Sequence, residues 1–251
     1  MNNKWNLKNK YALVTGGTKG IGKAIAIEMM EFGANVCIVA RSQKDIDTLT
    51  SQYPNLTGIQ ADLSNPETYP EIIEFVKKQY GKLDILVNNV GVNIRKKTTE
   101  YTPDEYQTIL NTNLTSAFEM SRLAHPLLKQ SEEGAVVNIS SVAGQKHLRT
   151  GSIYGMTKAA MIQLTKNLAG EWAADHIRVN AIAPWYIKTP LAETVLKNPS
   201  YYNEVLSRTP MKKIGDPGDV SSLAVFLCLP AASYITGQCI SVDGGFTIYG
   251  F

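Results

Sequence analysis

The sequence predicts an α/β fold, built as a single doubly wound (Rossmann-type) parallel sheet of about seven strands with helices on both faces. Short apolar strands alternate with segments of helical periodicity along the 251 residues, and no linker, repeat or change of composition interrupts them. A glycine-rich turn follows the first strand, where open α/β sheets bind nucleotides. We therefore expect one domain over residues 1–251, with a cofactor half at about 1–140 and a catalytic and substrate half at about 141–251.

The composition, with 44% hydrophobic and 19% charged residues, is typical of an ordinary globular protein. Its net charge of +3 is small and its lysines are scattered, which argues against nucleic acid and membranes as partners. The N-terminus lacks an apolar leader and no apolar run approaches ~20 residues, so we expect a cytoplasmic protein. The three cysteines are expected to be reduced core residues, and neither they nor the three histidines have metal-ligand spacing.

The elements of the first half follow one another regularly. Short apolar runs predict strands at 11–14, 35–40, 56–61 and 83–87. Helical periodicity predicts a helix through Ile25, Met29 and Phe32, a second at about 43–52 and a third at 66–80.

The second half begins with a long helix, expected from about 102 to 129 because Thr102 is a good N-cap and Pro103 suits the first turn. Strands are expected at 135–139, 177–182 and 239–242, and a helix carrying Tyr154 continues to about residue 174. Residues 185–213 combine short helical pieces with polar and aromatic side chains, as expected of a lid over the carboxyl edge of the sheet. A last helix should follow Asp216 and end near Leu229.

The glycine-rich turn is Thr15-Gly16-Gly17-Thr18-Lys19-Gly20-Ile21-Gly22. Between a strand and a helix, glycines bring backbone N–H groups and a helix N-terminus close to a pyrophosphate. Gly16 would permit the sharp turn, Gly20 a close approach of phosphate and Gly22 a close helix–strand contact. The glycines could instead form a plain tight turn that binds nothing, but their position between the first strand and the first helix favours a nucleotide-binding turn.

The second strand ends at Arg41, and no Asp or Glu occurs from residue 35 to 44. An NAD site usually has an acidic residue here, about 20 residues after the glycines, to hold the ribose 2′-hydroxyl. Arg41 and Lys19 are instead two cations that could hold a 2′-phosphate. The pattern favours NADP(H) over NAD(H), although two exposed basic residues would give the same pattern.

Tyr154 and Lys158 are four residues apart in a predicted helix, so their Cβ atoms should lie roughly 5–6 Å apart. Lowering a tyrosine pKa from about 10 to neutrality requires about 4 kcal/mol. An ammonium ~4 Å away supplies about that much at an intermediate dielectric, so the pair could form a general acid in a partly closed pocket. The pattern is common, and a packed tyrosine beside a solvated lysine is the alternative for the pair taken alone.

Along essentially its whole length the chain resembles the short-chain dehydrogenase/reductase family. The motifs that carry the resemblance occur in the family order: Thr15-Gly-x-x-x-Gly-x-Gly22, Asp62-Leu63, Asn88-Asn89-Val90-Gly91, Asn113, Ser141, Tyr154-x-x-x-Lys158 and Pro184. Residues 230–238 and the turn at 243–245 followed by Tyr249-Gly-Phe are further similar to the tropinone-reductase-like branch.

The resemblance implies four catalytic residues. Tyr154 would protonate the nascent alkoxide in reduction or take the proton in oxidation, and Lys158 would lower its pKa and bind the nicotinamide ribose. Ser141 would hydrogen-bond the carbonyl oxygen, which leaves Ser140 structural. Asn113 would hold a water in a proton relay behind Lys158.

The resemblance also implies a cofactor site, in which Asp62 and Leu63 flank the adenine, Asn88 anchors a strand edge nearby, and Ile187 and Thr189 touch the nicotinamide carboxamide. The full set of expected cofactor contacts is Gly16, Thr18, Lys19, Gly20, Ile21, Gly22, Arg41, Asp62, Leu63, Asn89, Gly91, Tyr154, Lys158, Pro184, Ile187 and Thr189.

Two residues depart from the family pattern: Val90 replaces the usual alanine and Trp185 the usual glycine. Trp185 would narrow the substrate pocket, prop the lid or simply pack. The expected substrate contacts are Ser141, Ala143, Gly151, Tyr154, Trp185 and Tyr186.

Together these features predict an NADP(H)-dependent carbonyl reductase or alcohol dehydrogenase that acts on a small-molecule ketone or alcohol. The family implies a homotetramer or homodimer, paired through the helices that carry Asn113 and Tyr154. A 3-oxoacyl thioester reductase would use the same catalytic residues, with Arg95, Lys96 and Lys97 available to meet an acidic carrier protein. A non-catalytic nucleotide sensor is the third reading.

Overall fold

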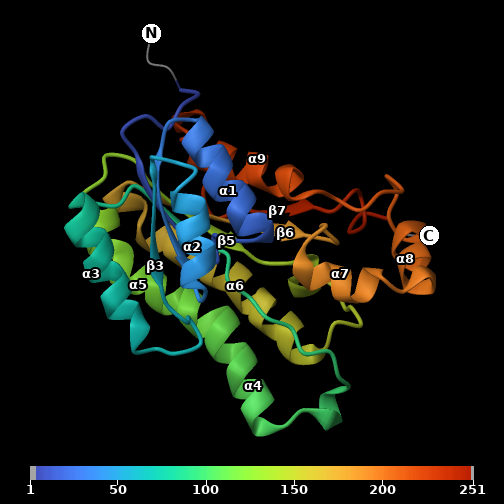
Figure 1. Cartoon of the computed structure of the whole chain (residues 1–251). Coiled ribbons are helices and arrows are strands. Elements are labelled where there is room, and N and C mark those ends of the chain that lie inside the picture. The colour runs from blue at the N-terminus through green and yellow to red at the C-terminus, as the bar shows by residue number, and fades with distance from the viewer. Residues whose placement is uncertain (1–3, 250–251) are drawn as a thin grey trace.

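The computed structural model describes residues 4–249, and across them the chain forms one parallel sheet of seven strands (Figure 1). Gly250 and Phe251, which belong to the C-terminal motif quoted above, lie outside the described residues. The strands are β1 Tyr11–Thr15, β2 Asn35–Ala40, β3 Leu56–Gln60, β4 Ile85–Asn88, β5 Gly134–Ile139, β6 Ile177–Pro184 and β7 Cys239–Val242. The predicted fold class is confirmed.

The strand order in the sheet is β3-β2-β1-β4-β5-β6-β7. The chain adds β2 and β3 on one side of β1, then returns and adds β4 to β7 on the other side. In an open parallel sheet the crevice at such a reversal, at the carboxyl ends of the strands, is the place where ligands bind. The site is therefore expected where β1 and β4 end.

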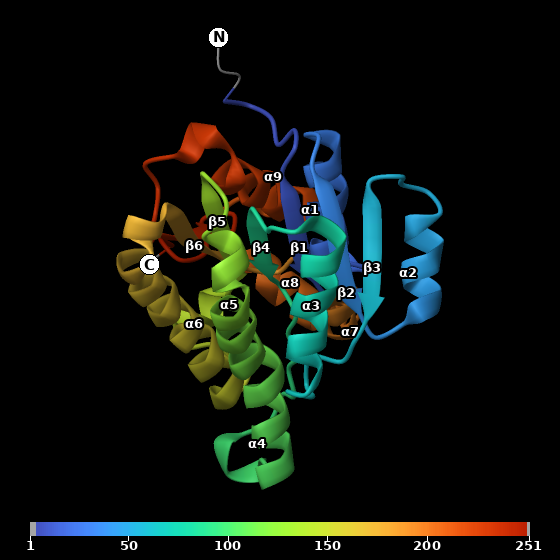
Figure 2. The same ribbon diagram turned by 90° about the vertical axis from the view of Figure 1, so that its left-hand side faces the viewer.

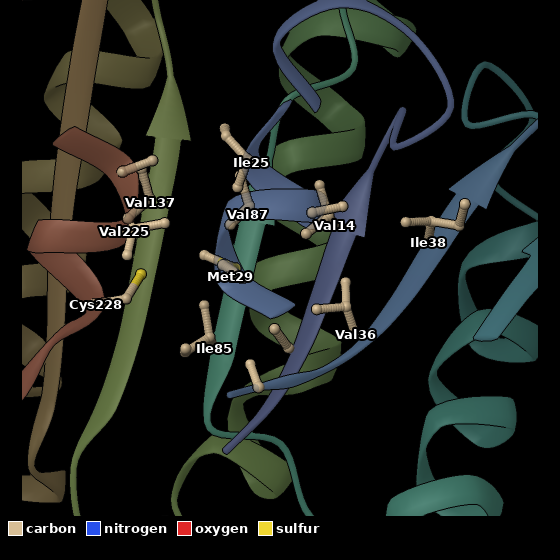
Figure 3. Close-up of a cluster of buried hydrophobic side chains, with 14 of the residues drawn as sticks. Val14, Ile25, Met29, Val36, Ile38, Ile85, Val87, Val137, Val225 and Cys228 are labelled. Carbon is tan, nitrogen blue, oxygen red and sulfur yellow. The ribbon is translucent and has the colours of Figure 1, made fainter. Parts of the chain in front are cut away.

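Helices cover both faces of the sheet. The main ones are α1 Gly20–Glu31, α2 Gln43–Thr50, α3 Thr68–Tyr80, α5 Ser116–Leu128, α6 Ser152–Glu171 and α9 Pro217–Cys228. Successive side chains of a strand point to opposite faces. Val14 accordingly packs in one core with Ile25 and Met29 of α1 (Figure 3), whereas Leu13 packs in the other with Ile72 of α3. Figure 2 shows α3, α5 and α6 side by side over this second core.

The long helix predicted at 102–129 is present and runs without a break from Pro103 to Leu128. It consists of α4 Pro103–Leu110, a π-helical turn at Asn111–Thr115 and α5, so the one feature not expected is the π-helical turn. The turn contains Asn113, whose side-chain amide accepts from Val92 N at 2.8 Å and donates to Val92 O at 2.9 Å. We attribute the π-helical turn to these two hydrogen bonds, since such turns are rare and occur frequently at functional sites.

A buried carboxylate holds the amino ends of the central strands. The predicted strand 83–87 begins two residues later than expected, and Asp84, which precedes β4, is fully buried. Asp84 accepts from Tyr11 N at 2.9 Å and from Ser131 Oγ at 2.6 Å, and it forms ion pairs with Lys10 and Lys82. The strands β1, β4 and β5 are therefore tied together at the edge of the sheet opposite the expected site.

Two short helices follow β6: α7 Pro190–Leu196 and α8 Pro199–Ser207, at the right of Figure 1. They are the helical pieces expected in residues 185–213, and each begins with a proline after a capping side chain, Thr189 or Asn198. The last helix, α9, begins directly after Asp216 as predicted. No helix in the described part of the chain is long and apolar enough to cross a bilayer.

Candidate active site

A cavity of about 590 Å³ opens at the carboxyl edge of the sheet, where β1 and β4 end. The glycine-rich turn, the ends of β2 to β6 and the segment around α7 all contribute to its wall. The predicted site residues that line it are Gly16, Thr18, Lys19, Gly20, Ile21, Arg41, Asp62, Leu63, Asn89, Gly91, Ser141, Tyr154, Lys158, Pro184, Trp185, Tyr186, Ile187 and Thr189. Four do not line it: Gly22, Asn113, Ala143 and Gly151.

The glycine-rich turn brings the start of α1 to the cavity. Gly16 has a φ of +68°, a left-handed conformation that favours glycine, and its N–H donates to Val39 O at 2.8 Å. Gly22 lies behind the turn, where a Cβ atom would overlap the carbonyl oxygen of Gly16 and the side-chain amide of Asn89. The first N–H groups of α1 have no side-chain cap. An uncapped helix N-terminus beside a cavity is suited to bind phosphate.

We expect Gly22→Ala to destabilise the protein by ~1–3 kcal/mol, because the added methyl group meets backbone that cannot move independently. Thermal unfolding and dinucleotide affinity should both decline. Gly170→Ala is the matched control: this residue lies in α6 with open space around its Cβ position, and it should gain ~0.5–1 kcal/mol. Equal stability of the two variants would contradict the packing role of Gly22.

At the end of β2 the two predicted cations differ in their surroundings. The ammonium of Lys19 lies 2.7 Å from the carboxylate of Asp45 in α2 and holds the pKa of that carboxyl below its usual value. Asp45 lies one residue beyond the window that lacks acids in the sequence. Both side chains are exposed enough to move, so the pair is weak. Arg41 lines the cavity and has no ion-pair partner among residues 4–249.

Lys158 is almost fully buried, at 2% exposure, and its Nζ donates to Ile139 O at 2.8 Å. The ammonium lies 5.7 Å from the centroid of the Tyr154 ring, on the same face of α6. Ser140 fixes α6 to the end of β5, because its Oγ donates to Lys158 O at 2.8 Å. This contact agrees with the structural role expected for Ser140.

Burial dominates the electrostatics of this pair. It raises the pKa of Tyr154, and a hydrogen bond from Ser141 together with the charge of Arg95 opposes the increase. Burial lowers the pKa of Lys158 to about 8. Arg95 is the cation that opposes the rise in the pKa of Tyr154 here, and the expected influence of Lys158 on that pKa stays a prediction. Tyr154 remains a neutral proton donor at neutral pH.

Asn113 stands behind this pair and does not line the cavity. It is fully buried, with both ends of its amide engaged by the backbone of Val92 and its nitrogen also 3.3 Å from Thr157 Oγ1. A Cβ atom on Gly91 would lie 3.4 Å from Lys158 Nζ and 3.5 Å from Asn113 Oδ1, so the amide and the ammonium flank the same glycine. Asn113 thus positions the backbone after β4, and the water relay stays a prediction.

Asn88 points away from the cavity into the sheet. Its side-chain nitrogen donates to Asn138 Oδ1 at 2.8 Å and to Ser121 Oγ at 3.0 Å. The neighbouring Asn89 instead donates to Thr15 O at 2.9 Å and links the ends of β1 and β4 at the cavity.

Ala143 and Gly151, predicted to touch substrate, line a separate pocket of about 340 Å³. Gly151 faces Tyr101, whose hydroxyl would overlap any Cβ atom at that position and which donates to Ile94 O at 2.6 Å. The glycine is therefore explained by the packing of Tyr101. Leu148 and Thr150 line both pockets, so contact of Ala143 and Gly151 with substrate stays a prediction.

Trp185 both lines the cavity and anchors the segment above it. Its ring stacks on Phe246 at 3.8 Å and meets Tyr186 edge-on at 4.6 Å, while Nε1 donates to Thr209 Oγ1 at 3.1 Å. Trp185 thus combines two of the roles considered from the sequence: it narrows the pocket and supports the segment at 185–213. Val90 also lines the cavity, against the glycine-rich turn.

Arg95 is the main residue that the sequence reading missed. Its guanidinium lines the cavity and donates to the hydroxyls of Tyr186, at 3.1 and 3.2 Å, and Tyr201, at 3.2 Å. The sequence offered Arg95 only as a contact for an acidic carrier protein; it lies in an exposed loop four residues after Gly91, at a ligand-binding strand end. Further lining residues outside the predicted set include Asn93, Thr112, Leu148, Thr150, Leu191 and Val195.

Comparison with known proteins gives one consistent result. The sequence model of a family described as enoyl-(acyl carrier protein) reductase matches residues 16–247. A tropinone reductase homolog of Arabidopsis thaliana is 52% identical over 99% of this chain and 96% of its own length. Senescence-associated protein 13 of the same plant is 48% identical over 100% of this chain and 94% of its own.

Solved structures agree with the sequence comparison. A short-chain type dehydrogenase/reductase from Mycobacterium marinum is 30% identical with a TM-score of 0.92, covering 98% of this chain and 99% of its own. A candidate NAD(P)-dependent gluconate 5-dehydrogenase from Beutenbergia cavernae, with NADP bound at low occupancy, is 30% identical with a TM-score of 0.93, covering 98% and 100%.

Proposed function

The chain belongs to the short-chain dehydrogenase/reductase family, and we propose that it transfers hydride between NADP(H) and the carbonyl or secondary-alcohol carbon of a small ketone, as a tropinone-reductase-like enzyme. One observation carries the proposal. Tyr154, Ser141 and Lys158 reach a single cavity whose wall also contains the glycine-rich turn and the uncapped start of α1. A proton donor thus shares one chamber with a site suited to a dinucleotide.

The residues present fit a nicotinamide dinucleotide. Gly16, Gly20 and Gly91 leave backbone exposed along the cavity, and Lys19 and Arg41 provide positive charge at the end of β2. The nicotinamide would supply or accept the hydride. NADP in the relative from Beutenbergia cavernae supports this choice of cofactor.

In the reductive direction the protein's task is to hold the carbonyl and deliver a proton. Ser141 and Tyr154 would hydrogen-bond the carbonyl oxygen, and the Tyr154 hydroxyl would give its proton to that oxygen as negative charge develops. The raised pKa of Tyr154 keeps the hydroxyl protonated until that moment. Lys158, held by Ile139 O, would stabilise the resulting phenolate and bind the ribose.

The direct test is NADPH oxidation by purified protein with a panel of linear, cyclic and bicyclic ketones, and NADP⁺ reduction with the matching alcohols. Turnover of at least one ketone that disappears in Tyr154→Phe is the expected result. No turnover with any ketone or alcohol would reject the proposal and favour the nucleotide sensor.

The cofactor preference has its own test. We expect native protein to prefer NADPH over NADH, and Arg41→Asp to reverse that preference because a carboxylate repels the 2′-phosphate and accepts from a 2′-hydroxyl. The measurement is kcat/KM with each cofactor at a fixed ketone concentration. Lys23→Asp is the control, since Lys23 lies in α1 and does not line the cavity. Equal use of both cofactors by native protein would contradict the assignment.

A 3-oxoacyl thioester reductase is the second candidate, and the matching family model, described as an enoyl-(acyl carrier protein) reductase, shares with it only the acyl thioester class of substrate. The basic loop supports it weakly, because Lys96 is paired with Glu105 and Lys97 does not line the cavity. Acetoacetyl thioesters in the ketone panel separate the two functions: faster turnover of a thioester than of every simple ketone would favour the second.

We further infer that residues 1–251 act as one domain with a lid at 185–213, in a cytoplasmic homodimer or homotetramer. The helices α5 and α6 expose Phe118 and Met156, which supports pairing through these helices. Light scattering of the purified protein measures the assembly directly.

A further inference from the structure

Arg95 carries a positive charge that the protein leaves unbalanced. Both of its hydrogen-bond partners are phenols, Tyr186 and Tyr201, whose oxygens lie 2.6 Å apart. Burial and the contact with Tyr201 raise the pKa of Tyr186 to about 12, so that hydroxyl stays neutral at neutral pH. No carboxylate forms an ion pair with Arg95 anywhere in residues 4–249.

Three other cations near the cavity are paired with acids, whereas Arg41 and Lys158 line it without a carboxylate partner among the described residues. Lys19 is paired with Asp45, Lys96 with Glu105, and Arg149, which lies over the Tyr201 ring, with Glu204. The contrast with Arg95 is sharpest for Arg149, because the two guanidiniums contact the same tyrosine and only one has a carboxylate.

The single acidic residue in the described wall of the cavity is distant from Arg95. Asp62 follows β3, and Arg95 follows β4, which is three positions away in the sheet order. Neighbouring strands lie about 4.8 Å apart, so the strand ends are separated by roughly 14 Å. Asp62 therefore does not neutralise the charge at the catalytic end.

At the catalytic end of the cavity, Arg95 also has N–H donors that no protein group in the described part of the chain accepts from. A guanidinium has five N–H donors, and the three contacts to the phenols leave two for a ligand. Its charge reaches Tyr154, where it opposes the rise of the pKa caused by burial. Arg95 and Tyr154 line the same cavity, so a ligand bound there meets a cation and the proton donor in one chamber.

We propose that the substrate is an anionic ketone, an oxo acid whose carboxylate binds Arg95 while its carbonyl faces Ser141 and Tyr154. The inference rests on the proposed function and specifies its substrate class. A reduced nicotinamide would supply the hydride for the new C–H bond. The π electrons of the C=O bond would move to the oxygen, which would take the Tyr154 proton, and the carboxylate would be unchanged. The product is the corresponding hydroxy acid.

The proposed substrate differs in charge from tropinone, the amine after which several relatives of this chain are named. Tropinone is an amino ketone that is protonated at neutral pH, and an unpaired guanidinium in the cavity repels a cation. A carboxylate in the same place gains a charge-assisted, bidentate hydrogen bond.

The test compares oxo acids of increasing length, from pyruvate through levulinate to longer chains, with their methyl esters and with tropinone. The quantity measured is the ratio of kcat/KM for each acid to that for its ester. We expect the best acid to exceed its ester by roughly 10- to 100-fold, the range expected for a hydrogen bond to a charged group, and tropinone to be a poor substrate. In Arg95→Gln the ratio should fall to about one.

Two variants control for other causes. Lys97→Gln removes a charge from the same loop outside the cavity, and Tyr201→Phe removes one phenol contact while the guanidinium remains. Both should retain the preference for the acid. An acid-to-ester ratio of kcat/KM near one in native protein, or the same ratio in native protein and Arg95→Gln, would overturn the inference. Turnover of the esters in that case would still support the proposed function.

Ligand binding gives a readout that does not depend on turnover. Native protein saturated with NADP⁺ should bind valerate more tightly than valeramide by calorimetry, and Arg95→Gln should lose the difference. Equal binding of the two by native protein rejects the carboxylate site, even if no ketone in the panel is reduced.

Discussion

Tyr154→Phe should reduce turnover by ~10²–10⁴-fold, the contribution of general acid–base catalysis, while NADPH affinity stays nearly unchanged. The phenylalanine ring keeps the packing of the half-buried tyrosine beside Ser141 and Lys158, so the change removes a proton and little else. The measurements are single-turnover NADPH oxidation and NADPH titration of the same preparation. A variant that keeps more than about a hundredth of native turnover would show that another group supplies the proton.

The matched control is Tyr80→Phe. The Tyr80 hydroxyl is 2.7 Å from Thr57 Oγ1 and does not line the cavity. Loss of this hydrogen bond should cost ~1 kcal/mol of stability and leave turnover unaffected. A similar loss of activity in both variants would indicate a general disturbance of the fold.

Lys158→Met should inactivate the enzyme and stabilise the free protein. The pKa of Lys158 falls from 10.5 to about 8 on folding, because burial disfavours the charged form. Each pKa unit corresponds to 1.36 kcal/mol, so a shift of about 2.5 units costs ~3 kcal/mol at neutral pH. Methionine fills a similar volume without charge, and a gain of ~1–3 kcal/mol in unfolding free energy is expected once the lost bond to Ile139 O is included.

The pH dependence follows from the sign of the shift. Because the folded pKa lies below the unfolded one, the unfolded chain binds more protons between pH 8 and 10.5. The penalty is complete below pH 8 and disappears as the pH rises through this window. Native protein should therefore gain stability there relative to Lys158→Met.

Urea denaturation at pH 7 and pH 10 measures both effects. Lys166→Met removes a charge from the exposed side of the same helix and serves as the control. A Lys158→Met protein that is less stable than native at pH 7 would mean that the buried ammonium is net favourable in the fold, contrary to the shift.

The fold could be predicted because its signals are local. Each strand is a short apolar run such as the one at Val36 to Val39, and several helices begin with a cap or a proline, as at Thr102 and Asp216. The glycine-rich turn and the pair Tyr154 and Lys158 have fixed spacing, so all of their expected residues except Gly22 line the cavity.

The features that the sequence did not predict are contacts between distant segments. Gly151 is explained by Tyr101, fifty residues earlier, and Asp45 reaches Lys19 from a different helix. The contacts of Arg95 with Tyr186 and Tyr201 could not be predicted, because these partners lie about a hundred residues later. The sequence alone contains no periodicity that joins such positions.

The Asp84 cluster has a consequence for how such a fold changes its chemistry. Its ion pairs and hydrogen bonds hold β1, β4 and β5 at the edge remote from the cavity. The framework does not depend on whatever molecule is recognised at the other edge. Substitution of Val90, Arg95 or Trp185 during evolution could therefore change the substrate specificity, because the Asp84 cluster keeps the strands in register independently of these residues.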